Sequence, residues 1–140
     1  MHTRTARWLS ALLLLVLLAG VMAPALAAQT SRKFKFSPSA SCRNRNHVGN
    51  NWSQEYYVNG TKVKKGARIE LHVGDTVSVR VVVTERDKYP DTGSCTLTHT
   101  VTETDISKGF KLEGSVTVRE DRGRYAGNTC TWNITIKFSK

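Results

Sequence analysis

Apolar residues occupy every second position along most of the chain after residue 30. The clearest case is residues 75–84, where valine stands at positions 77, 79, 81 and 83 with mainly polar residues between them. A period of two is that of a β-strand with one buried face, whereas an amphipathic helix has a period of 3.6 residues. No window outside the N-terminal segment has a convincing helical period. The chain is therefore predicted to be all-β.

Turn signals separate the alternating runs. Asn59-Gly60 lies between residues 56–58 and 61–63, and this dipeptide favours a type I′ hairpin because both turn residues need a positive φ. In that register Tyr56 faces Val63 and Glu55 faces Lys64. A second hairpin is expected between residues 69–73 and 75–84, with Gly74-Asp75 as its turn.

Further strands are expected at residues 33–36, 95–101, 111–119 and 129–138, with a bulge at Gly114. The total is about eight short strands, which suits a sandwich or barrel better than a parallel sheet. We expect a single antiparallel β-sandwich, Ig-like or C2-like in general architecture.

The N-terminal segment has the three parts of a secretory signal peptide. Arg4 and Arg7 precede an apolar run over residues 9–22, and Ala25 and Ala27 fit a cleavage site for small residues. Residues 1–28 are therefore predicted to be removed after cleavage near Ala27, which leaves a secreted domain over residues 29–140. We expect no membrane span after processing, because the apolar run is short and no basic stop-transfer segment follows it.

The positive charge is concentrated early in this domain. The whole chain carries a net charge of +10, and residues 29–68 contain nine basic side chains against one acid, Glu55. Aromatic residues are interleaved with them, an arrangement that can hold an anionic polymer by charge and by stacking. The expected ligand-binding residues are Arg32, Lys33, Lys35, Arg43, Arg45, Trp52, Tyr57, Lys62, Lys64, Lys65 and Arg68. The alternative is that the charge serves solubility and that Phe34 and Phe36 belong to a half-buried edge strand.

A second candidate site is the acidic loop that contains Glu85, Asp87 and Asp91. Ca²⁺ needs several oxygen ligands, and a carboxylate-rich turn can supply them. The loop resembles the acidic loop of C2-type sandwiches, in which a strand ends in D-x-D, although here the first position is Glu and Arg86 and Lys88 reduce the charge. A second loop, at residues 103–105 or 120–121, would complete such a site. The alternative is an ordinary turn with solvated charges.

Three cysteines leave one thiol unpaired if a single disulfide forms. Cys95 and Cys130 lie on the apolar faces of their expected strands, whereas Cys42 lies in a polar stretch. We therefore expect a Cys95–Cys130 disulfide, worth about 3 to 4 kcal/mol in the chain-entropy model. Pairing of Cys42 with either of the others is the alternative.

The sequence contains no G-x-S-x-G, P-loop or metalloprotease motif. The histidines lack zinc-ligand spacing, and the pairs Glu70 with His72 and His99 with Glu103 are the residues that a small nuclease could use. The sequence therefore favours a secreted, non-catalytic binding module that contacts an anionic polymer or surface, such as a wall polymer, a glycan or a nucleic acid. One alternative is a calcium-dependent binding module, the only one of these functions for which we expect a cofactor, Ca²⁺. The other alternative is a secreted nuclease or hydrolase. The oligomeric state is left open.

Overall fold

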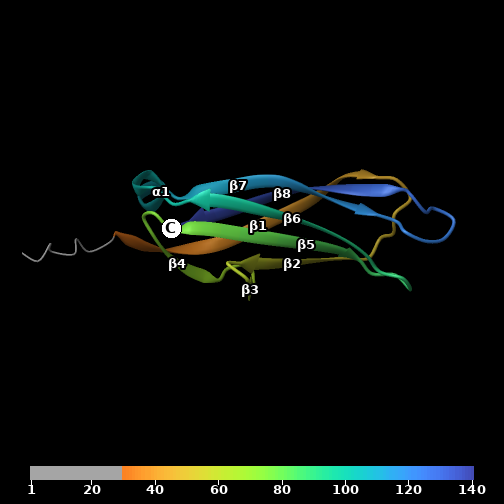
Figure 1. The fold of residues 1–140 in the computed structure, drawn as a ribbon, viewed down its shortest axis with the longest axis horizontal. Coiled ribbons are helices and arrows are strands. Elements are labelled where there is room, and N and C mark those ends of the chain that lie inside the picture. The colour runs from red at the N-terminus through yellow and green to blue at the C-terminus, as the bar shows by residue number, and fades with distance from the viewer. Residues whose placement is uncertain (1–29) are drawn as a thin grey trace, which may run out of the picture.

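The computed structural model describes residues 30–140 and consists of two four-stranded antiparallel sheets packed face to face (Figure 1). Sheet A has the order β4 (Arg68–His72), β1 (Ser31–Arg45), β8 (Thr129–Ser139) and β7 (Phe110–Arg119). Sheet B has the order β3 (Thr61–Val63), β2 (Trp52–Val58), β5 (Thr76–Glu85) and β6 (Asp91–Thr100), and a short helix, α1 (Glu103–Lys108), links β6 to β7. The expected eight-stranded antiparallel sandwich is confirmed at this level. The predicted signal peptide, residues 1–28, lies outside the described residues.

The core lies between the sheets and follows the alternation in the sequence. The four odd-numbered valines of β5 are fully buried, and so are the apolar residues of β8 that face them across the sandwich, including Ile134 and Ile136. Phe36, Phe110 and Phe138 add a set of ring contacts at one end of the core. Within residues 30–140, no helix is long and apolar enough to cross a bilayer.

The hairpin of β2 and β3 has the predicted turn and register. Asn59 and Gly60 both have positive φ angles, and Tyr56 pairs with Val63. Because β3 ends at Val63, Glu55 forms its ion pair with Lys62 rather than with Lys64.

The second predicted hairpin is wrong. β4 pairs with β1 in sheet A, whereas β5 pairs with β2 and β6 in sheet B. The turn at Gly74 instead carries the chain from one sheet to the other, and the Asp75 side chain closes it by accepting a hydrogen bond from the His72 N–H at 2.8 Å. β4 and β5 lie in opposite sheets, and each buries its alternate residues in the core between them. Their sequence pattern is therefore the same as that of two strands in one hairpin.

β1 is a central strand rather than the short edge strand expected at residues 33–36. It pairs with β4 through residues 31–35 and with β8 through residues 35–45, and Phe34 and Phe36 are fully buried. The rest of this strand was not predicted, because it contains Pro38 followed by small polar residues. Proline removes a ladder donor and is uncommon in a central strand.

β6 of sheet B runs beside β7 of sheet A and closes one edge of the sandwich (Figure 1). Gly114 of β7 lies where a Cβ atom would stand 2.6 Å from Leu97 Cδ2 of β6. The register of β7 with β8 runs without interruption from Phe110 to Arg119, so the bulge predicted at Gly114 is wrong. This glycine permits the close approach of the two sheets instead.

Candidate functional site

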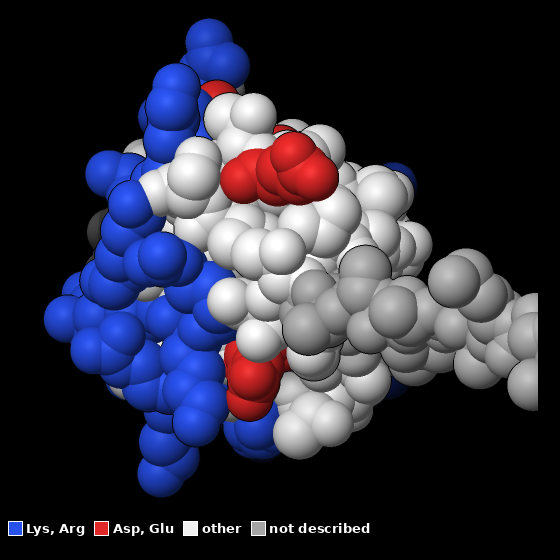
Figure 2. Space-filling model, turned by 90° about the vertical axis from the view of Figure 1, so that its left-hand side faces the viewer, with Lys and Arg blue, Asp and Glu red and all other residues white. Residues whose placement is uncertain are grey.

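The outer face of sheet A carries a row of basic side chains that crosses all four strands. Lys35 of β1 is directly opposite Arg68 of β4, and Lys137 of β8 is directly opposite Lys111 of β7. All four side chains are exposed, and we call them the basic row. Figure 2 looks along the sandwich from the end that holds α1, and its left side, the side of sheet A, is covered by Lys and Arg. Lys33 stands next to the row, opposite Glu70.

The row places like charges against each other. Directly opposed like charges on neighbouring strands destabilise a sheet, by about 0.2 to 1 kcal/mol for a pair. Lys111 is partly compensated by Glu113, whose carboxylate lies 3.0 Å from its Nζ. Among the ion pairs of the described side chains, none involves Lys35, Arg68 or Lys137.

The other predicted polymer-binding residues are spread over the molecule. Lys64 and Lys65 lie in the loop between β3 and β4, and Lys62 lies on β3 of sheet B, where it pairs with Glu55. Arg43 is exposed at an irregularity of β1 between Cys42 and Asn44. Arg45 ends β1. Of these residues, Lys64 and Lys65 lie nearest the basic row, because the Gly66 N–H that follows them donates a hydrogen bond to the carbonyl of Phe36.

Two of the predicted ligand-binding residues, Trp52 and Tyr57, make contacts within the fold. Arg32 shares the side of β1 that carries the buried phenylalanines, and its Nε is buried without a hydrogen-bond partner. Trp52 packs edge-on against Trp132 at 5.2 Å, and its Nε1 donates to the carbonyl of Gly49. Tyr57 lies in sheet B and donates its hydroxyl hydrogen bond to Glu55. The prediction that Arg32 and Trp52 bind a ligand is not supported by these positions.

The outer face of sheet B is different in kind, because it is covered by hydroxyl groups. Thr76 pairs with Thr100, and Thr84 pairs with Thr92 with their hydroxyls 3.1 Å apart. The sandwich therefore has one basic face and one face that is rich in hydroxyl groups.

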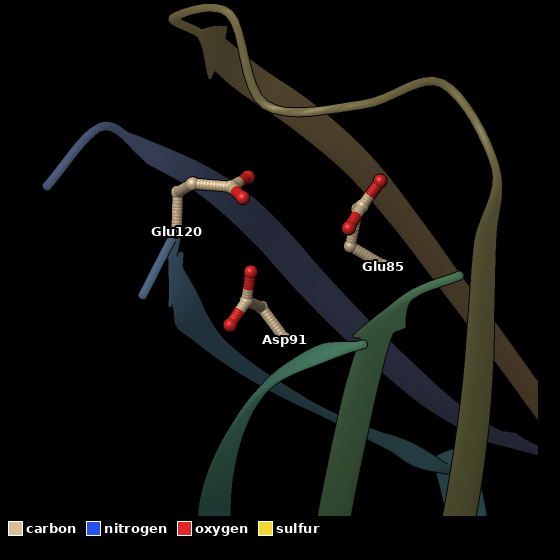
Figure 3. A group of neighbouring side chains, drawn as sticks. All are labelled: Glu85, Asp91 and Glu120. Carbon is tan, nitrogen blue, oxygen red and sulfur yellow. The ribbon is translucent and has the colours of Figure 1, made fainter. Parts of the chain in front are cut away.

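At the end of the sandwich away from α1, three carboxylates come together (Figure 3). They belong to Glu85 at the end of β5, Asp91 at the start of β6 and Glu120 just after β7, and one oxygen of each lies within 4.8 Å of the others. We call these residues the acidic cluster. Each of them occupies the next core-facing position of its strand. Glu85 follows Val83 in β5, Glu120 follows Val118 in β7, and Asp91 precedes Gly93 in β6. The pattern that builds the core therefore also aims these acids inward.

Two members of the acidic cluster are well shielded from solvent. Glu85 is 2% exposed and Asp91 is 6% exposed, and one carboxylate oxygen of each, Oε2 and Oδ2, has no hydrogen-bond partner. Burial, followed by the charges of Asp87, Glu120 and Asp91, raises the pKa of Glu85 above its ordinary value. Burial and the neighbouring carboxylates, Asp91 first, also raise the pKa of Glu120.

Asp87 does not belong to the acidic cluster, although we predicted it as a calcium ligand with Glu85 and Asp91. It is exposed, and its Oδ1 accepts a hydrogen bond from the Tyr89 N–H at 2.6 Å, so it stabilises the turn between β5 and β6. Its place is taken by Glu120, which the sequence left as one of two options for a second loop. The core-facing alternation of residues 112–118 was the signal that pointed to Glu120.

Two loops border the acidic cluster and leave a depression of about 420 Å³, lined among others by Glu85, Glu120 and Tyr125. The ring of Tyr125 stacks on His47 of the other loop at 5.1 Å. A Cβ atom on Gly49 would collide with the Glu85 carboxylate, so glycine at this position makes room for the acid. The depression gives water and small ions a route to the carboxylates.

No disulfide joins the three cysteines, all of which lie within residues 30–140. The Cys95–Cys130 bond stays a prediction for the oxidised protein. Cys42, expected in a polar segment, packs against the core as Cys95 does, so facing the core does not distinguish these two. Partial burial raises the pKa of the Cys95 thiol, which keeps it in its less reactive form.

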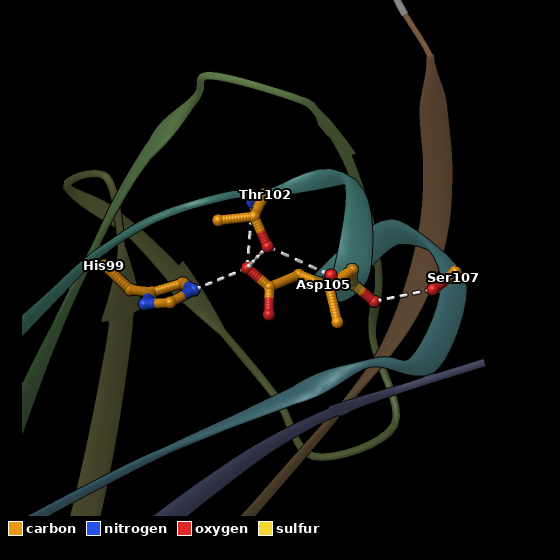
Figure 4. A network of polar contacts seen from close by, with 5 residues as sticks. His99, Thr102, Asp105 and Ser107 are labelled. Atoms are coloured by element: carbon orange, nitrogen blue, oxygen red, sulfur yellow. Dashed lines mark hydrogen bonds and ion pairs between the residues drawn. The ribbon is translucent and has the colours of Figure 1, made fainter.

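The histidines form local contacts instead of the pairs considered for a nuclease. His99 Nε2 lies 2.8 Å from Asp105 Oδ2, rather than pairing with Glu103, and Asp105 forms a capping box with Thr102 at the start of α1 (Figure 4). This helix was not predicted, although Thr-x-x-Asp is a signature of such a box. His72 pairs with Asp75 at 3.4 Å, not with Glu70. These contacts fix turns and helix ends.

Comparisons with known proteins give no match: no family model, no curated protein and no solved structure is similar to this chain.

Proposed function

We propose that the protein is a secreted, non-catalytic module that binds an anionic polymer through the outer face of sheet A. The polymer is one that carries regularly spaced phosphate, sulfate or carboxylate groups, such as a wall polymer, a glycan or a nucleic acid. We further propose that the sandwich is Ig-like or C2-like in general architecture.

The observation that carries the proposal is the pair of direct oppositions, Lys35 with Arg68 and Lys111 with Lys137. Solubility alone requires dispersed charge rather than like charges on adjacent strands. A bound anion between the opposed side chains turns their repulsion into attraction on both sides. All four side chains are exposed on the same outer face, so that an extended chain that crosses the strands can reach them.

A salt titration tests this proposal. Binding of a labelled sulfated glycan, a polyglycerol phosphate and a single-stranded DNA is measured over a range of salt concentrations. If four cations contact the polymer, log Kd changes with log salt with a slope of roughly 3, because each contact releases a counterion from a single-stranded polyanion. Binding that is absent for all three polymers, or insensitive to salt, contradicts the proposal.

A matched pair of double variants locates the interface. Lys35→Gln with Lys137→Gln removes two charges from the basic row, and we expect roughly 30-fold weaker binding at about 1 kcal/mol for each charge. Arg80→Gln with Lys88→Gln also removes two exposed charges, from sheet B and from the loop between β5 and β6. If this control weakens binding as much as the first variant does, net charge rather than the face of sheet A accounts for the affinity.

A further inference from the structure

We propose that Glu85, Asp91 and Glu120 form a Ca²⁺ site at the end of the sandwich away from α1. The site is separate from the basic row, and the inference does not rest on the proposed binding of a polymer.

The first argument is geometric. Two oxygens that each lie about 2.4 Å from one Ca²⁺ ion can be at most about 4.8 Å apart. One oxygen from each of the three carboxylates meets this condition. In Figure 3 the three side chains point toward one another from three different segments of the chain.

The second argument is the state of the buried oxygens. A buried carboxylate oxygen without a partner is costly, and such groups in folded proteins are normally paired or bound to a metal ion. Glu85 and Asp91 each have one such oxygen and are more than nine-tenths buried. Among the described side chains, no lysine or arginine forms an ion pair with the acidic cluster, although Arg86 lines the adjoining depression, so the charge of the three carboxylates is left without a direct partner.

The third argument concerns the identity of the ion. All three protein ligands are carboxylates, which favour hard cations over zinc or copper. Asp91 Oδ1 accepts a hydrogen bond from the Asp121 N–H at 3.3 Å, which leaves Oδ2 as its oxygen without a partner. Mg²⁺ demands a near-ideal octahedron and gives up its bound water reluctantly, so three carboxylates from three separate segments suit Ca²⁺ better. Ca²⁺ accepts six to eight oxygens in flexible geometry, and water from the adjoining depression can supply the rest.

The test is the melting temperature of the protein with Ca²⁺, with Mg²⁺ and with a chelator. For an affinity typical of extracellular modules, about 10 mM Ca²⁺ raises the melting temperature by several degrees, and the chelator reverses the rise. Calorimetric titration gives the stoichiometry, expected to be one ion per chain. No shift with Ca²⁺, or an equal shift with Mg²⁺, overturns the assignment.

Variants separate the acidic cluster from the general acidity of the loop. Glu85→Gln and Glu120→Gln each remove one ligand charge, and we expect at least a tenfold loss of Ca²⁺ affinity in each. Glu120 is only half-buried, so its variant remains informative if the change at Glu85 impairs folding. Asp87→Asn is the matched control, because it removes a charge from the same loop outside the cluster. If the control loses Ca²⁺ binding, or if Glu120→Gln retains it, the site is not the one proposed.

The outcome is independent of the polymer assay. The substitutions in the basic row leave the acidic cluster untouched, and polymer binding is measured in the presence of chelator. A protein that binds Ca²⁺ but no polymer supports this inference and contradicts the proposed function, and the reverse result does the opposite.

Discussion

Gly93 of β6 is the position where the closed edge between β6 and β7 can be tested most directly. A Cβ atom there would collide with the backbone carbonyl oxygen of Thr117, and it would also lie 3.0 Å from Val116 Cγ1. Thr117 is held in the ladder between β7 and β8, so this obstacle cannot rotate away. Gly93→Ala therefore forces the two sheets apart.

The matched control is Gly114→Ala on the opposite strand of the same edge. Its obstacle is Leu97 Cδ2 at 2.6 Å, while the next atoms of that leucine stand 3.6 Å away, so a change of side-chain rotamer relieves the clash. Overpacking costs about 1 to 3 kcal/mol, and we place Gly93 at the upper end and Gly114 at the lower end of this range. Replacing glycine by alanine also stabilises the protein by about 0.4 to 1 kcal/mol, because alanine lowers the conformational entropy of the unfolded chain. The net expectation is about 2 kcal/mol of destabilisation for Gly93→Ala and close to none for Gly114→Ala.

Urea unfolding followed by tryptophan fluorescence measures this difference. We expect the midpoint to fall in Gly93→Ala with the slope unchanged, and the melting temperature to fall by about 8 °C relative to the control. Equal stability of the two variants would refute the reasoning, because it would mean that β6 does not lie against the backbone of β7.

Three further predictions concern stability and the thiols. Partial burial alone would raise the pKa of Asp105, but hydrogen bonds from His99 and Thr102 more than offset it and hold the pKa below its ordinary value. Wild type should therefore be about 1 kcal/mol more stable than Asp105→Asn at neutral pH, with the difference lost as the pH falls through the lowered pKa in chemical denaturation curves. Val81→Ala should cost about 2 to 3 kcal/mol in the same assay, because this side chain is fully buried between the sheets. If the predicted disulfide forms on export, alkylation of the unreduced, unfolded protein should modify Cys42 alone, as read by intact mass.

Local patterning was enough to predict the strands but not all of their partners. The alternation in β5 and β8 and the Asn59-Gly60 turn are local features, and each has the predicted form. Whether the chain after Gly74 returns in the same sheet or crosses to the other depends on the partners of β4, which lie far away in the sequence. The two solutions bury the same residues, so no local pattern distinguishes them.

The candidate sites show the same division. Counting charges placed Lys35 and Arg68 in a basic region. It did not show that they lie directly opposite each other, because this depends on the pairing of β1 with β4. Counting charges by region could not single out Lys111 and Lys137 as part of a basic surface, because residues 69–140 contain equal numbers of acidic and basic side chains. In the acidic cluster, Glu85 and Asp91 were expected together, and Glu120 joins them only because β7 ends at the same end of the sandwich.

The pairing of β1 with β8 has a mechanical consequence. The two strands are antiparallel neighbours, and Lys35 near the start of β1 pairs with Ser139 at the end of β8. A force applied between residues 30 and 140 therefore loads the ladder from one end, so that its hydrogen bonds break one after another instead of sharing the load. The polymer proposed above would pull on the outer face of sheet A, and tension between it and one terminus would not open this ladder from its end. The fold should then resist tension between its ligand and one terminus better than tension between its two termini.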